Sequence, residues 1–161
     1  MKVLNMIGMA AVAIAVAVLS AGQVGLFAGT PPSNLGVKDG RLQAPSNSPN
    51  SVSSQAALYP DHPQKTYASI APLPFEGDAQ AAMNRLVAVL AQSPGTVIVS
   101  KNSTYVYAQC STAVLKFTDD VEFWLDKPAG VIQFRSASRL GSKDFGVNRA
   151  RMEGIRAKFQ A

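Results

Sequence analysis

Basic side chains are concentrated near the carboxyl end of the chain, and they are the residues best suited to bind a ligand. Residues 135–161 hold seven lysines and arginines against two acids, so this segment accounts for the formal net charge of +5. Guanidinium groups bind carboxylates and phosphates through paired donors, and a helix amino terminus adds partial positive charge. We therefore predict a candidate anion site, formed by Arg135, Arg139, Asn148, Arg149 and Arg151.

The same arginines have an alternative use, which is to form structural ion pairs within the domain. The acids available for this are Asp119, Asp120, Glu122 and Asp144. Adjacent strand residues point to opposite faces of a sheet, so Asp119 and Asp120 cannot readily converge as a metal site or an acid/base pair. We expect Asp119 to point inward and to need a partner there, either Arg139 or Arg149.

The remaining reactive residues exclude several kinds of chemistry. Cys110 is the only cysteine and His62 the only histidine, so no intrachain disulfide forms and a four-ligand zinc site lacks ligands. A Ser-His-Asp assembly would have to be built on a proline-rich segment that is poorly suited to holding catalytic geometry. We predict no metal and no cofactor.

The amino-terminal segment is typical of a membrane helix. After Lys2, residues 3–29 carry no charge and show no polar stripe, and they are long enough to cross a bilayer. The leading lysine predicts that the amino end stays in the cytoplasm and that the rest crosses. Two interpretations remain open: an uncleaved anchor spanning residues 3–28, or a signal peptide cut near Ser20-Ala21-Gly22.

The rest of the chain divides into an arm and a domain. Residues 30–76 hold eight of the ten prolines and predict an irregular, extended arm in which regular helix is disfavoured. Residues 77–161 predict an α+β domain. Its first helix begins after Asp78, which can cap it, and buries Ala82, Met83, Leu86, Val87 and Leu90.

Four strands are expected between two helices of this domain. They are residues 96–100, 105–110, 113–125 and 131–138, and a last helix follows over 146–158 with Val147, Met152, Ile155 and Phe159 as its apolar stripe. Alternation along 113–125 predicts one face for the core and one for water. The expected fold is a four-stranded antiparallel sheet with both helices on one face and the other face open to arm, solvent or ligand.

Several motifs resemble the domain-of-unknown-function family 1499. They are LGVKDGRL (35–42), SPNSVSSQ (48–55), DDVEF (119–123) and RSASRLGSKDFGVNRARMEGIR (135–156), within a similarity that covers residues 35–159. The resemblance implies an envelope or organellar protein and brings no catalytic activity. It also implies two arm cysteines, at positions that are Ala44 and Ser51 here. If those cysteines pair in relatives, this arm lacks a constraint worth about 2–3 kcal/mol.

These patterns lead to a functional prediction with open alternatives. We expect an anchored or secreted domain of the cell envelope, on the extracytoplasmic (periplasmic) side, that is not an enzyme. Its partners would be an anionic small molecule, a lipid headgroup or an envelope protein, and export argues against nucleic acid. The alternatives are a metal-independent hydrolase and a structural scaffold.

Overall fold

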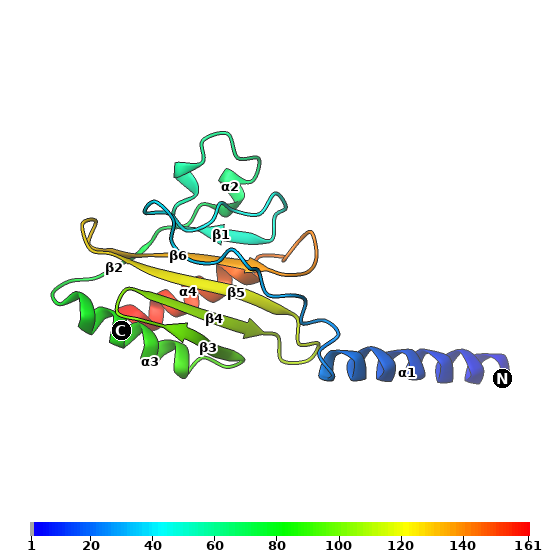
Figure 1. Cartoon of the computed structure of the whole chain (residues 1–161). Coiled ribbons are helices and arrows are strands. Elements are labelled where there is room, and N and C mark those ends of the chain that lie inside the picture. The colour runs from blue at the N-terminus through cyan, green and yellow to red at the C-terminus, as the bar shows by residue number, and fades with distance from the viewer. Residues whose placement is uncertain (1) are drawn as a thin grey trace.

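The computed structural model describes residues 2–161 and shows a long isolated helix attached to an α+β domain (Figure 1). Along the chain the elements are α1 (Lys2–Gln23), β1 (Ser51–Ser53), the 3-10 helix η1 (Ala56–Leu58), α2 (Lys65–Ala68), β2 (Leu73–Pro74), α3 (Ala79–Ala91), β3 (Thr96–Lys101), β4 (Tyr105–Ser111), β5 (Thr118–Asp126), β6 (Val131–Ser138) and α4 (Val147–Gln160).

Helix α1 projects away from the domain instead of packing on it (Figure 1). Its segment Asn5–Gln23 is long and apolar enough to cross a membrane, and almost none of it is buried. Met6 and Met9, for example, are 69% and 73% exposed. Residues 5–20 of the helix are therefore exposed, and among residues 5–23 only Ala21 and Gly22, in the last turn, are partly or fully buried.

The sheet has six strands, where four were predicted. Its order is β1-β6-β5-β4-β3, and β2 also pairs with β6, every pairing being antiparallel. Both additional strands come from the proline-rich arm: β1 pairs along residues 135–137 of β6, and β2 along 131–132. The prediction missed them because they are very short and are stabilised by the edge of β6 and not by a pattern of their own.

The alternation along β5 and β6 separates the two faces of the sheet. Val121, Phe123 and Leu125 lie opposite Ser136, Phe134 and Ile132, and they point to the face that carries α3 and α4. Glu122 and Trp124 point to the other face, where arm residues lie: the Gly36 amide bonds Glu122, and Gly40 lies beside the Trp124 ring. As predicted, both helices lie on one face (Figure 1).

The two domain helices follow the expected patterns closely. The Asp78 carboxylate accepts a hydrogen bond from the Ala81 amide at 2.7 Å and so caps α3. In α4 the side chains of Met152, Ile155 and Phe159 are buried, but Val147 is 44% exposed, so its expected place in the stripe was wrong. Val147 lies in the first turn, beyond the edge of the core.

The long strand predicted over 113–125 is shorter than expected. Residues 112–117 form a turn in which Lys116 takes a left-handed φ of 58°, and β5 begins only at Thr118. Leu115 and Phe117, which were expected in the core, are half-buried and exposed respectively. The arm also contains the short helices η1 and α2, where only irregular structure was expected.

Candidate functional site

The five residues predicted to bind an anion lie in different environments around β6 and α4. Arg135 and Arg139 extend over the arm face of the sheet, where they meet Glu122 and Asp120. Asn148 and Arg151 lie on the helix face with Ser136 and Asp119. Arg149 reaches back to carbonyl oxygens of the arm. The structure does not bring these five side chains together around one cavity.

Arg139 and Asp120 form a buried bidentate ion pair. Arg139 Nε donates to Asp120 Oδ2 at 2.9 Å and Nη2 donates to Oδ1 at 2.7 Å, with both side chains at most 5% exposed. The Tyr107 hydroxyl also donates to Asp120 Oδ1 at 2.6 Å. The hydrogen bond to Asp120 raises the pKa of Arg139 further, so the guanidinium stays charged. Arg139 Nη1 donates to the Ala28 carbonyl, which ties the end of the α1 segment to this pair.

Asp119 pairs with Arg151 on the opposite face of the sheet. Arg151 Nη2 donates to Asp119 Oδ2 at 2.5 Å, while Nη1 contacts Asn148 Oδ1 at 2.9 Å and Ser136 Oγ at 3.1 Å. Asp119 does point inward, as predicted. The prediction that its partner is Arg139 or Arg149 was wrong, because Arg151 takes that place. One turn of α4 separates Asn148 from Arg151, so both reach the same end of the sheet.

Asp144 organises the start of α4 and contacts the arm. Its carboxylate accepts hydrogen bonds from the backbone amides of Gly146 and Asn148, both at 3.0 Å, and from the Tyr67 hydroxyl. Burial alone would raise the pKa of Asp144, but the hydrogen bonds from Tyr67, Asn148 and Gly146 outweigh it and hold the pKa below its usual value. In the described part of the chain no cation lies within 4.0 Å of it, so Asp144 acts as a helix cap.

Glu122 and Arg135 hold the arm onto the sheet. Glu122 is fully buried, and its Oε1 accepts from the Gly36 amide at 2.6 Å and from the Tyr105 hydroxyl at 2.7 Å. Arg135 Nε donates to the Ala44 carbonyl at 3.1 Å, and its Nη1 lies 4.0 Å from Glu122 Oε2. Burial lowers the pKa of Arg135. The pKa of Tyr105 is raised, mainly by burial and to a lesser extent by its hydrogen bond to Glu122.

A hollow in the arm was not predicted from the sequence. Its walls come from residues 34–39, 41–44 and Tyr59, and its volume is about 770 Å³. Two bases, Lys38 and Arg41, line it together with Asp39. Lys38 and Arg41 exchange backbone hydrogen bonds around Asp39-Gly40, which have φ values of 51° and 70°. Asp-Gly is the usual pair for such a two-residue hairpin turn, so this motif was the available signal.

Among the described residues, the side chains near the arm hollow could bind a ligand by charge, and the cysteine and histidine are not placed for catalysis or metal binding. Cys110 is buried, and burial raises the pKa of its thiol. His62 Nδ1 accepts from the Gln64 amide within its own turn. Within residues 5–161 no group of three or more His, Cys, Asp or Glu side chains is placed to hold a metal ion. Lys38 and Arg41 are exposed, and neither side chain has a hydrogen bond or ion pair to another described residue.

Comparison with known proteins gives a family and no function. No curated protein and no solved structure matches the chain. The model of the family described as "Protein of unknown function (DUF1499)" matches residues 41–159, which is well over half of the chain and contains every strand and helix after α1 except the last residue of α4. The chain therefore belongs to the DUF1499 family.

Proposed function

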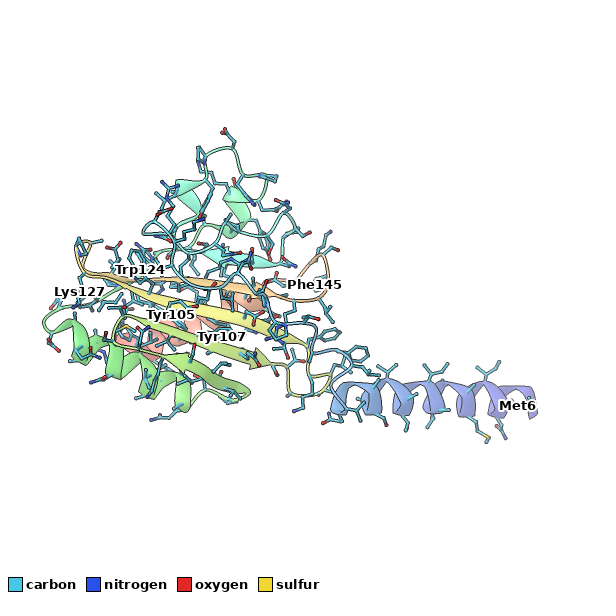
Figure 2. The ribbon with its side chains drawn as sticks, in the orientation of Figure 1. Met6, Tyr105, Tyr107, Trp124, Lys127 and Phe145 are labelled. Atoms are coloured by element: carbon cyan, nitrogen blue, oxygen red, sulfur yellow. The ribbon has the colours of Figure 1, made fainter. Side chains whose placement is uncertain are left out.

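We propose that this protein is a non-enzymatic domain of the cell envelope, held by α1 in the membrane with residues 30–161 on the extracytoplasmic side. The observation that carries this proposal is the placement of α1. This apolar helix leaves residues 5–20 exposed and meets the domain only at its last turn (Figure 2). Transfer of such a helix from water into lipid lowers its free energy.

The contacts at the end of α1 favour an uncleaved anchor over a cleaved signal. Gly22 is buried against the turn 112–117, and a Cβ there would lie 2.7 Å from the Leu115 carbonyl oxygen. The Gln23 side chain donates to the Val114 carbonyl at 2.8 Å. Cleavage near Ser20-Ala21-Gly22 would remove the Gly22 contact and the helix that positions Gln23.

The internal use of charge favours a scaffold over an enzyme. Asp119 and Asp120 are each paired with a guanidinium on opposite faces of the sheet, and Glu122 bonds the arm. Carboxylates used in this way hold elements together and are not presented to a substrate. The domain is then a rigid platform whose exposed surfaces meet partners in the envelope.

Membrane extraction of matched variants tests the anchor. The full chain, carrying a carboxy-terminal reporter active only after export, should stay in the membrane pellet at alkaline pH and show reporter activity. Ile14→Arg should release it, because an arginine at the centre of a spanning helix costs about 2.5–3.5 kcal/mol, whereas Ile14→Leu should change nothing. The mass of the intact protein distinguishes an uncleaved anchor, which keeps the full length, from a cleaved signal peptide, which shortens the chain. A chain that fractionates with the cytosol and lacks reporter activity contradicts the proposal.

A second candidate function, anion binding in the arm hollow, is favoured by Lys38 and Arg41. Two bases against the single acid Asp39 leave a net positive lining. Titration of the full chain in detergent with inorganic phosphate, followed by amide chemical shifts, should move residues 34–44 first. The double variant Lys38→Gln, Arg41→Gln should abolish these shifts, while Lys101→Gln on the exposed end of β3 should not. Equal shifts in both variants contradict the candidate.

A further inference from the structure

The end of the domain beside α1 is joined to that helix without a spacer. This end, called here the α1 end, consists of the turn 112–117 and the loop 139–146, between β6 and α4. A tight turn with a left-handed Gly25 ends α1 at Gln23, and its hydrogen bonds run from the Gly25 amide to Gly22 and from the Leu26 amide to Ala21. Directly after it, Phe27 stacks on Phe117 with ring centroids 5.2 Å apart, and the Ala28 carbonyl accepts from Arg139. The chain therefore passes from α1 onto the domain within a few residues.

The length of α1 then places the α1 end at the surface of a bilayer. At about 1.5 Å per residue, its 22 residues extend roughly 33 Å, close to the thickness of the hydrocarbon core, about 30 Å. If α1 spans that core, Gln23 reaches the boundary between acyl chains and headgroups. The turn 112–117, which Gly22 and Gln23 touch, must lie at the same depth.

The side chains exposed at the α1 end are unusually apolar for a surface in water. Phe145 is 93% exposed, Val114 57% and Leu140 42%. Leu140, Phe145 and Val147 line a hollow of about 260 Å³ together with Phe117 and Lys143. Figure 2 shows Phe145 at the end of the domain from which α1 leaves, and Lys127 at the opposite end.

The backbone holds Phe145 outward at a conformational cost. Phe145 has a left-handed φ of 53°, which non-glycine residues seldom adopt. The Asp144 carboxylate, just before Phe145, accepts from the amides of Gly146 and Asn148, just after it, and so holds the turn that contains Phe145. Because the Phe145 ring is 93% exposed, it adds little buried apolar area to this fold and is free to contact a partner outside the domain.

We propose that the α1 end rests on the bilayer that α1 spans, with Phe145 and Leu140 inserted at the headgroup boundary. The inference rests on the proposed membrane anchor and adds a second, interfacial contact to it. Apolar side chains bury about 5–10 Å deep at such a boundary. Lys143, which is exposed, and Lys116 lie in the two segments of the α1 end and would meet anionic headgroups. The contact fixes the tilt of the domain relative to the membrane.

Quenching by brominated lipids measures the depth of this surface directly. The full chain with Trp124→Phe, its only native tryptophan removed, is reconstituted into vesicles of phosphatidylcholine and phosphatidylglycerol. Phe145→Trp and, separately, Leu140→Trp report the α1 end, and Lys127→Trp at the far end is the matched control. Bromines near the top of the acyl chains should quench roughly half of the emission at 145 and 140, and about none at 127.

The outcomes separate this inference from the anchor on which it rests. Each variant is first floated with the vesicles on a density gradient. If the chain floats and tryptophans at 145 and 140 are quenched no more than the one at 127, the interfacial surface is refuted and the anchor stands. If the chain stays at the bottom of the gradient, both are refuted. Blue-shifted and quenched emission at 145 and 140, in a floating chain, supports the proposal.

Discussion

Replacing Arg139 with methionine tests whether the buried ion pairs hold the domain together. The substitution keeps much of the side-chain volume and removes the charge opposite Asp120, whose side chain is 1% exposed. Breaking a buried pair from one side costs about 3–5 kcal/mol, because the remaining charge has neither water nor partner. Tyr107 still donates to Asp120 Oδ1 at 2.6 Å, so we expect the lower end, about 3 kcal/mol.

Urea unfolding of the full chain in mild detergent measures this loss, with Trp124 emission as the signal of the sheet. Glu153→Gln is the matched control, because it breaks the Arg156 pair at a carboxylate that is 49% exposed, and should cost at most about 1 kcal/mol. Arg139→Met combined with Asp120→Asn should recover part of the loss, since no unpaired charge remains. If Arg139→Met costs no more than the control, Asp120 is hydrated and the argument for internal pairing is wrong.

Three other substitutions probe single contacts, each measured by the same unfolding assay. Asp144→Asn should cost about 1–2 kcal/mol at neutral pH by weakening the cap of α4. Because the pKa of Asp144 lies below its usual value, its contribution is complete above about pH 4 and disappears as pH falls through the lower folded pKa, so the two proteins should converge in acid. Gly95→Ala should cost about 1–3 kcal/mol, because Gly95 has a φ of 70° and the new Cβ would meet the Ser111 carbonyl oxygen at 2.4 Å. Tyr105→Phe should cost about 1–3 kcal/mol by leaving Glu122 Oε1 with one donor fewer. Since burial and Glu122 raise the pKa of Tyr105, that stabilisation is present below about pH 10 and is lost only as alkali titrates the folded phenol.

Local patterns predicted the elements whose stability is local. The Asp78 cap, the buried face of α3 and the bounds of β6 follow from periodicity and capping, and the structure confirms them. β1 and β2 could not be predicted in this way, because a strand of two or three residues exists only where another edge receives it. The error over residues 113–117 has a similar cause. The alternation of apolar and polar residues continues through this segment, but the left-handed backbone of Lys116 turns the chain and ends the strand pattern.

The candidate site shows the same limit at the level of side chains. Sequence patterns identified the arginines and acids that carry charge in this domain, yet not which arginine meets which acid. Asp119 meets Arg151 because strand register and the phase of α4 bring them together, and neither can be obtained from spacing along the chain. The Lys38 and Arg41 hairpin carried a local signal in Asp39-Gly40, but the hollow beside it depends on how the arm folds back.

Non-covalent contacts hold the arm of this protein in place. At the two positions where the family resemblance implies cysteines, the Ala44 carbonyl accepts from Arg135 and the Ser51 hydroxyl accepts from the Ser46 amide at 2.8 Å. These two positions therefore hold the arm through separate hydrogen bonds, one to β6 and one within the arm. Folding of this chain requires no thiol oxidation, so its maturation should be indifferent to the oxidising or reducing state of the compartment in which it emerges.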